Sequence, residues 1–149
     1  MYYSSFIILF ILWAFSPIGA IANSVETIPY DNDLVGDVRY DFSRSVEYLV
    51  EGHSMESYGF MDGMRVDVVP STTFQVGDVI AFECAFDKCD GAYVKKIMKK
   101  DGTCYWVEGR KDVWEENGLR RQSMDSRTTY GWLCNNDITI YGVAFPQKG

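Results

Sequence analysis

Short apolar runs alternate with turn signals along the chain from residue 46 onward. The clearest run is MRVDVV at 64–69, in which apolar and polar positions alternate as in a strand with one buried face. Asp-Gly and Gly-Asp dipeptides, which are typical of tight turns, separate most of the runs. The other predicted strands are VEYLV at 46–50, DVIAFEC at 78–84, AYVKKIM at 92–98, TCYWVEG at 103–109 and ITIYGVAF at 138–145. With no convincing long helix, this pattern predicts a mainly β domain over residues 46–149, with a curled or barrel-like antiparallel sheet.

The N-terminal part of the chain has a different pattern. Residues 6–22 form a run of 17 residues without a charge, which is slightly shorter than the about 20 residues that span a bilayer as a helix. Residues 1–22 are therefore either an apolar membrane-anchor helix or a secretory signal segment that is cleaved. Residues 23–45 are polar and acidic and predict a linker or arm. Acidic residues after an apolar run favour export of the C-terminal part of the chain, so we expect an extracytoplasmic domain that is membrane-anchored or, after cleavage, secreted.

Length and charge narrow the class of protein. A chain of 149 residues with 47% hydrophobic residues is enough for one compact domain with a substantial core. The net charge of −7 argues against non-specific nucleic-acid binding, which needs clustered Lys and Arg. Basic residues gather at 95–100 and 110–121, but acidic residues flank both groups. They are simplest to interpret as solvated faces, and no nucleic-acid partner is expected.

All 4 cysteines lie in the part of the chain that we expect to be exported. An even number of cysteines in an oxidising compartment favours disulfides. Cys84 and Cys89 bracket a predicted hairpin tip and could close a short loop, and Cys104 with Cys134 would then join two strands. Two alternatives remain open. One is a zinc site, although the single histidine and the lack of a CxxC pair argue against it, and the other is four buried thiols.

One serine and one lysine stand out as candidate chemistry. Ser54 lies on the Gly-His-Ser-Met turn after the run at 46–50, although most serines in such turns only shape the turn. Lys95 lies in the apolar run at 92–98, where alternation places it on the opposite face from Lys96. If both faces are even partly covered, at least one of the two ammonium groups loses water and its pKa falls, because burial disfavours the charged form.

A buried lysine of this kind can act as a general base. A free lysine is almost wholly protonated at neutral pH, and lowering its pKa to about 7 takes on the order of 4–5 kcal/mol of differential desolvation. That penalty is hard to explain for a purely structural residue, whereas a base that takes a proton from a serine hydroxyl requires it. His53 is the only histidine, and it neighbours Ser54 on a segment where adjacent side chains point apart, so a Ser-His pair is not expected.

Four motifs together resemble those of type I signal peptidases. They are Gly-x-Ser-Met at 52–55, Gly-Asp-Val-Ile at 77–80, Val-Lys-Lys-Ile at 94–97 and Ser-x-Asp-Ser-Arg-x-x-Tyr-Gly at 123–131. They occur in the order found in that family, behind an N-terminal apolar segment, and the resemblance covers roughly residues 46–145. The self-cleaving LexA-type repressors share the same catalytic core, and the segment SMESYGFMDGM is just as similar to their nucleophile region.

The resemblance implies a role for each matching residue. Ser54 matches the nucleophile and Lys95 the general base, while Lys96 matches a second basic position that is not catalytic. The backbone N–H of Ser54 would hold the oxyanion. Some family members add a hydroxyl two residues before the serine, and because Gly52 stands there, any such help must come from its backbone.

The loop at 123–131 is implied to support the dyad. Ser123 matches a hydroxyl that orients the lysine amine, and Asp125 pairs with Arg127 to brace the site. Without the resemblance, this segment is only a polar turn. Two departures concern the shape of the substrate pocket: Ser57 stands where a proline is usual, and Gly-Arg-Lys at 109–111 replaces the usual Gly-Asp-Asn.

The resemblance implies a membrane-anchored serine endopeptidase with a Ser/Lys dyad, which cleaves signal peptides from exported precursors after small residues. Its partners would be those precursor polypeptides and the membrane, and it would need no cofactor and no metal. Two alternatives remain open. One is a self-cleaving regulator of the LexA type, and the other is a catalytically inactive extracytoplasmic β domain that binds peptides.

Overall fold

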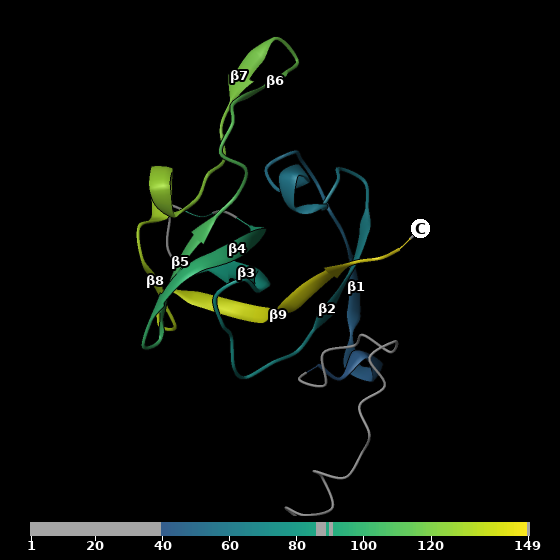
Figure 1. Ribbon diagram of the computed structural model, residues 1–149, viewed down its shortest axis with the longest axis vertical. Coiled ribbons are helices and arrows are strands. Elements are labelled where there is room, and N and C mark those ends of the chain that lie inside the picture. The colour runs from purple at the N-terminus through teal and green to yellow at the C-terminus, as the bar shows by residue number, and fades with distance from the viewer. Residues whose placement is uncertain (1–39, 86–88, 90, 149) are drawn as a thin grey trace, which may run out of the picture. The chain divides into compact units, whose positions relative to one another are not determined.

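The computed structural model describes residues 40–85, 89 and 91–148, and these residues form a mainly β structure. One antiparallel sheet has the strand order β1-β2-β9-β3-β4-β5-β8 (Figure 1). Its strands are β1 (Val46–Leu49), β2 (Arg65–Val69), β3 (Val79–Cys84), β4 (Ala92–Asp101), β5 (Cys104–Glu108), β8 (Leu133–Cys134) and β9 (Ile138–Pro146). A separate hairpin pairs β6 (Trp114–Glu116) with β7 (Leu119–Arg121). Three short helical turns complete the described elements: η1 (Phe42–Arg44), η2 (Glu56–Tyr58) and η3 (Ser126–Tyr130).

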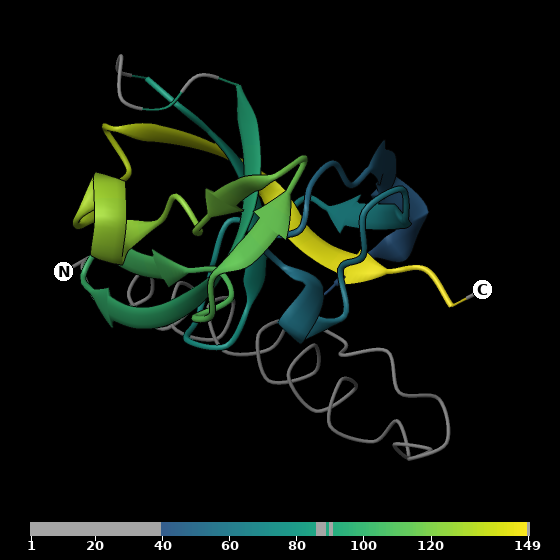
Figure 2. The ribbon, with the colours of Figure 1, turned by 90° about the horizontal axis from the view of Figure 1, so that it is seen from above.

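The prediction of a mainly β, antiparallel architecture is confirmed. Each predicted strand is present, and β4 extends three residues further than expected, to Asp101. The barrel alternative is wrong for the described strands, because β1 and β8 form two unjoined edges of an open sheet. Viewed from above, the long strand β9 runs across the sheet between the N-terminal strands and the end that carries η3 (Figure 2). The apolar helix predicted within residues 1–22 lies outside the described residues.

Two apolar clusters hold the sheet, and the alternation of side chains along the strands assigns residues to each. In β3, Ile80 and Phe82 belong to the larger cluster, while Ala81 faces the other way into a smaller cluster with Val66 and Val68 of β2. The smaller cluster also contains Val50, Met55 and Phe60, which flank the turn that carries Ser54. The turn that carries Ser54 therefore packs on a buried apolar cluster.

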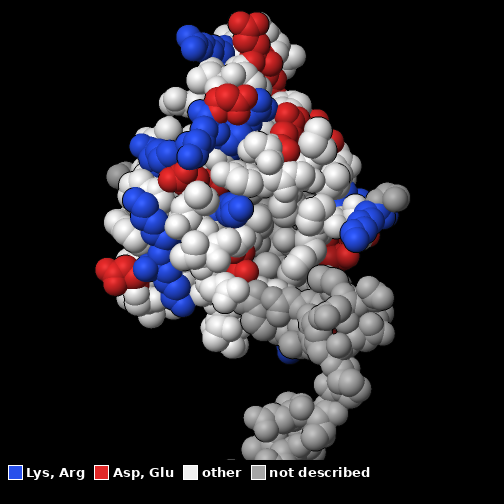
Figure 3. All heavy atoms as spheres, viewed as in Figure 1, with Lys and Arg blue, Asp and Glu red and all other residues white. Residues whose placement is uncertain are grey.

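The hairpin β6–β7 was not predicted, although its turn signal is present in the sequence. Asn117 and Gly118 both have positive φ, of 52° and 74°, as the two central residues of a tight hairpin turn require. The flanking strands carry charges instead of alternating apolar residues, so periodicity gave no signal. Basic and acidic side chains lie next to each other at the end of the molecule that this hairpin forms (Figures 1 and 3).

The predicted disulfide pairs are both present. Cys84 bonds to Cys89 across a Cα–Cα distance of 5.3 Å. Cys104 bonds to Cys134, its direct partner across β5 and β8, at a Cα–Cα distance of 3.9 Å. The zinc and free-thiol alternatives are therefore wrong, since no cysteine among the described residues is free.

The predicted linker at 23–45 overlaps the described residues only from Tyr40 onward. Tyr40 is buried in the larger cluster, with its ring centroid 5.0 Å from that of Phe145, and its hydroxyl donates to Asp78. The end of the predicted arm thus packs on β9. Within the part of the chain that the structure describes, no helix is both long and apolar enough to cross a membrane.

Candidate active site

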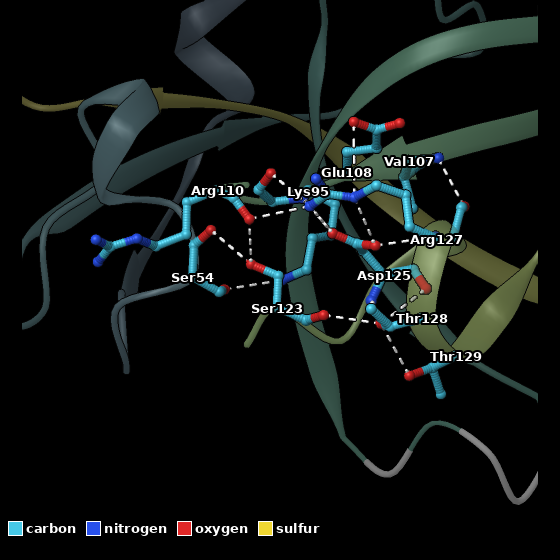
Figure 4. A network of polar contacts seen from close by, with 12 residues as sticks. Ser54, Lys95, Val107, Glu108, Arg110, Ser123, Asp125, Arg127, Thr128 and Thr129 are labelled. Atoms are coloured by element: carbon cyan, nitrogen blue, oxygen red, sulfur yellow. Dashed lines mark hydrogen bonds and ion pairs between the residues drawn. The ribbon is translucent and has the colours of Figure 1, made fainter. Parts of the chain in front are cut away.

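Ser54 and Lys95 lie next to each other, although 41 positions separate them in the sequence. Their side-chain tips, Oγ and Nζ, are 2.9 Å apart (Figure 4). The turn after β1 presents the serine, and the middle of β4 presents the lysine. At this distance a proton can pass directly between the two groups.

Local backbone conformation and hydrogen bonds shape the turn that carries Ser54. Gly52 has a φ of +87°, which a residue with a side chain adopts only with strain. Its N–H donates to Asp62 Oδ1 at 2.8 Å, so this group is already engaged and does not face an oxyanion. The Ser54 N–H has no acceptor among the described residues and is therefore free to stabilise a developing oxyanion.

Burial of Lys95 shifts its titration toward neutral pH. The residue is only 3% exposed, and its Nζ bonds to the Val94 carbonyl at 3.0 Å as well as to Ser54. Loss of water lowers the pKa of Lys95 from 10.5 to about 8, and the charge of Asp125 opposes this shift in part. Lys95 forms no ion pair with any described carboxylate. Its amine is therefore neutral in a substantial fraction of molecules slightly above neutral pH.

The alternation predicted for β4 places the two neighbouring lysines in different surroundings. Lys95 faces inward, whereas Lys96 is half-buried with its Nζ 4.9 Å from the ring centroid of Tyr58. Of these two lysines, only Lys95 contacts the Ser54 hydroxyl.

Asp125 and Arg127 form the pair that the resemblance implies. Asp125 is 0% exposed, and its carboxylate accepts bonds from the Arg127 guanidinium, the Arg127 N–H and the Gly109 N–H. The arginine also donates to the carbonyl of Gly109 at 3.1 Å. This brace joins η3 to the end of β5 and satisfies a carboxylate that would otherwise be buried without partners.

Ser123 lies at the site, but its hydroxyl contacts backbone. It donates to the Arg110 carbonyl at 3.0 Å and lies 3.4 Å from the Ser54 carbonyl. Among the described contacts, none joins it to the Lys95 amine. In this structure Ser123 ties the loop to the nucleophile turn, and its role in orienting the amine remains a prediction.

Sequence reasoning missed two residues, Gly109 and Arg110, that it noted only as a departure from the family pattern. A Cβ on Gly109 would lie 2.6 Å from both Ser123 Oγ and the Ser54 carbonyl oxygen, so glycine is required there. The Arg110 N–H donates to the Ser54 carbonyl at 2.7 Å. The glycine in the Gly-Arg-Lys segment was the available signal, because a glycine at the end of a strand often marks a close backbone approach.

His53 is not part of a Ser-His pair. Its Nδ1 lies 2.5 Å from Glu56 Oε1, and its Nε2 lies 3.7 Å from Glu116 in the β6–β7 hairpin. The Glu56 contact raises the pKa of the His53 imidazole. No group of three or more metal-ligating side chains occurs among the described residues.

A groove of about 550 Å³ borders the dyad. Ser54 and Lys95 line it together with the edge strand β1, apolar side chains of β2, β3 and β4, and residues of the hairpin and the loop before η3. Tyr48 and Leu49 of β1 are exposed along it. The groove therefore places an unpaired strand edge next to the serine hydroxyl, an arrangement that suits an extended peptide.

Comparison with known proteins gives one family match. The model of a family described as Peptidase S24-like matches residues 12–125, which is more than half of the 149 residues. The matched range includes Ser54, Lys95, Ser123 and Asp125. No curated protein and no solved structure matches the chain.

Proposed function

The chain belongs to the Peptidase S24-like family, and on that basis we propose that it is a serine endopeptidase in which Ser54 is the nucleophile and Lys95 the general base. The contact of 2.9 Å between Ser54 Oγ and a buried Lys95 Nζ carries this proposal. The lowered pKa of Lys95 supports it, because a base for a serine hydroxyl must be neutral near the working pH.

Acylation begins with the neutral amine. The Ser54 hydroxyl then donates to Nζ, and as Oγ attacks the peptide carbonyl its proton passes to the lysine. The free Ser54 N–H stabilises the oxyanion of the tetrahedral intermediate. Lys95, now protonated, gives the proton to the leaving amine, and the acyl group remains on Ser54.

Deacylation repeats these steps with water in place of the serine. Lys95 is neutral again once the amine has left, and it takes a proton from a water molecule that attacks the ester carbonyl. The product leaves as a carboxylic acid while the proton returns from Lys95 to Ser54 Oγ, and the acid then ionises by releasing its proton to solvent. The same residue thus serves both halves of the reaction, with no external proton donor.

The finer proposal concerns the substrate and its location. We propose exported precursors, cleaved after small residues, as substrates, with the domain outside the cytoplasm and residues 1–22 as an anchor or cleaved signal. A substrate segment would add to the exposed edge of β1 within the groove. The two disulfides support an oxidising compartment.

A second candidate is self-cleavage of the LexA type, which the S24-like match favours over the signal-peptidase resemblance. In that case the scissile bond lies in the chain itself, and cleavage is intramolecular. The two candidates share the dyad and differ in how the rate depends on protein concentration.

One cleavage experiment tests both candidates. The purified full chain is incubated with a precursor peptide that carries small residues before its cleavage site, and both peptide and protein are followed by mass spectrometry. Ser54→Ala and Lys95→Ala should abolish cleavage, whereas Lys96→Ala should retain most of it. Peptide cleavage that is proportional to protein concentration supports the endopeptidase, and cleavage of the chain at a concentration-independent rate supports self-cleavage.

Two outcomes would overturn the dyad assignment: normal cleavage by both dyad variants, or peptide binding by the wild type without any cleavage. The second outcome would favour the inactive binding domain. A compartment reporter fused to the C-terminus tests location separately. Reporter activity confined to the cytoplasm would overturn the export proposal and leave the dyad untouched.

A further inference from the structure

Arg110 joins parts of the site that are far apart in the sequence. Its backbone N–H donates to the Ser54 carbonyl at 2.7 Å. Its own carbonyl accepts from Ser123 Oγ at 3.0 Å and from the Arg127 guanidinium at 2.9 Å. The backbone of this one residue therefore connects the nucleophile turn to the loop that carries the brace.

The side chain of Arg110 makes a second connection to the nucleophile turn. Its Nη1 lies 3.0 Å from Oε2 of Glu56, the first residue of η2, and the two side chains are only 16% and 26% exposed. The guanidinium also pairs with Asp112 on the solvent side and lies 5.1 Å from the ring centroid of Trp114. A planar, multidentate cation in this position holds its partners more rigidly than a point charge would.

These two connections hold the chain at the carbonyl of Ser54 itself and at a residue shortly after it. The backbone bond holds the Ser54 carbonyl, and the ion pair holds Glu56, two residues further on. Met55, the residue between them, is buried in the smaller apolar cluster. A turn held at three successive residues has little freedom to move its hydroxyl away from Lys95.

We propose that Arg110 is a positioning residue for Ser54, and that its ion pair with Glu56 fixes the nucleophile turn at the distance from Lys95 at which the proton transfers. This inference rests on the proposed function, because it assigns a role within the same reaction. It adds the ion pair between Arg110 and Glu56 to the site. Arg110 stands where the signal-peptidase pattern has aspartate, in the segment where Gly-Arg-Lys replaces Gly-Asp-Asn.

A positioning role and an electrostatic role of the Glu56–Arg110 ion pair predict different pH profiles of the reaction rate. Neither Arg110 nor Glu56 is among the groups that shift the pKa of Lys95. Loss of the ion pair should therefore lower the rate without moving the pH at which the rate is half-maximal. A residue that acted through the charge of Lys95 would move that pH.

A double-mutant cycle tests the proposal. Glu56→Gln, Arg110→Gln and the double variant are compared with wild type in peptide cleavage. We expect kcat to fall about 10- to 100-fold in each single variant, because small misplacements of a reacting group have effects of this size. The double variant should lose no more kcat than the more affected single variant, because both substitutions remove the same ion pair. The KM of Glu56→Gln should stay within about threefold of wild type, since Arg110 keeps its contact with Trp114, which lines the groove.

Asp112→Asn is the matched control, because it removes the exposed partner of the same guanidinium and leaves Glu56 in place. Its kcat should remain near the wild-type value, as expected for an exposed ion pair. Additive losses in the cycle, or an equal loss in Asp112→Asn, would overturn the proposal. So would a shift in the half-maximal pH of Glu56→Gln.

Amide hydrogen exchange separates failure of this inference from failure of the proposed function, because it needs no activity. The Arg110 N–H is bonded to the Ser54 carbonyl, so Glu56→Gln should speed its exchange at least tenfold, while Asp112→Asn should not. Inactive wild-type protein with this exchange pattern would count against the peptidase and support the positioning contact. Active protein with unchanged exchange in Glu56→Gln would refute the positioning contact alone.

Discussion

Lys95 and Asp125 are both buried residues of ionisable type at the same site, yet they differ in how many hydrogen-bond and ion-pair partners surround them. Asp125 is fully enclosed, and its carboxylate is paired with Arg127 and accepts backbone N–H groups as well. Lys95 is almost as buried, but among the described residues its amine has hydrogen bonds only to a hydroxyl and a carbonyl, and it lies 5.8 Å from the ring centroid of Tyr93.

The difference separates a structural charge from a reactive one. A carboxylate that is paired and fully hydrogen-bonded has the cost of its burial offset by its partners, whereas a desolvated amine without a counter-ion releases its proton more easily. The Asp125–Arg127 brace holds the loop against β5. In the proposed mechanism, burial of Lys95 makes its amine available to exchange a proton with Ser54. Substitutions of Lys95 and of Asp125 should therefore have different effects on activity and stability. The largest effect is expected at Lys95.

Lys95→Met should have the largest effect and should move activity and stability in opposite directions. Without a base, kcat should fall by about 10⁴-fold or more, which is the scale of losing a catalytic dyad or triad member. The folded protein should meanwhile become more stable near neutral pH. The difference between 10.5 and about 8 in the pKa of Lys95 corresponds to about 3 kcal/mol of free energy of unfolding.

The size of that stability gain depends on pH. An unfolded lysine stays protonated up to about pH 10.5 and the folded one only up to about 8, so the burial cost is fully present below pH 8 and disappears as the pH rises to about 10.5. Urea unfolding of wild type and Lys95→Met at pH 7 and pH 10 measures it. Lys96→Met is the control, and an equal gain in both variants at pH 7 would contradict the assignment of the buried lysine.

Asp125→Asn should destabilise the protein where Lys95→Met stabilises it. The substitution leaves the Arg127 guanidinium without its buried partner and replaces one acceptor oxygen with a donor. The free energy of unfolding should fall by about 3 kcal/mol. Urea unfolding at pH 7 measures this change, and Asp112→Asn, which removes an exposed carboxylate, should leave the urea midpoint unchanged. An unchanged midpoint in Asp125→Asn would show that the brace is not structural.

Gly109→Ala tests the close approach between the brace and the nucleophile turn. The new Cβ would lie 2.6 Å from the Ser54 carbonyl oxygen and from Ser123 Oγ, so the turn must move. We expect a loss of about 2 kcal/mol in the free energy of unfolding and a fall in kcat of about tenfold or more. Thermal unfolding and peptide kinetics give the two values. Wild-type kinetics in this variant would mean that the turn can shift without effect on the hydroxyl.

The smallest predicted effect is a shift in the pH profile. In wild type, kcat/KM should rise with pH and reach half its maximum near pH 8, because only neutral Lys95 acts as the base. The charge of Asp125 raises the pKa of Lys95, so Asp125→Asn should move the midpoint to lower pH. The profile is measured well below the melting temperature of the variant. A wild-type rate that rises only above about pH 10 would mean that burial does not lower the lysine pKa.

The fold was largely predictable because its signals are local. Alternation in β2 and β4, the glycine turns and the cysteine spacing each depend on residues close in sequence, and each prediction was confirmed. The β6–β7 hairpin was missed because its strands carry charges and bury little. The sequence could not show whether the sheet closes into a barrel, since similar strand patterns occur in barrels and in open sheets.

The candidate site was only partly predictable. The motifs identified Ser54, Lys95, Asp125 and Arg127 by resemblance, but no local pattern pointed to the ion pair between Glu56 and Arg110, which are 54 positions apart. The prediction that the Ser123 hydroxyl orients the Lys95 amine was limited in the same way, because it concerns a contact between segments far apart in the sequence. Its place near the site follows from the motif, whereas its bonding to the Arg110 carbonyl depends on how two loops meet.

The sequence alone determined which residues could do the chemistry and that the two lysines of β4 lie on opposite faces, because strand alternation is a property of the local backbone. Only the tertiary structure decided that the Lys95 amine lies 2.9 Å from Ser54 and has no carboxylate partner within the described part of the chain. The desolvation that shifts its pKa comes from distant segments packed over it, and burial of this kind arises only when the chain has folded.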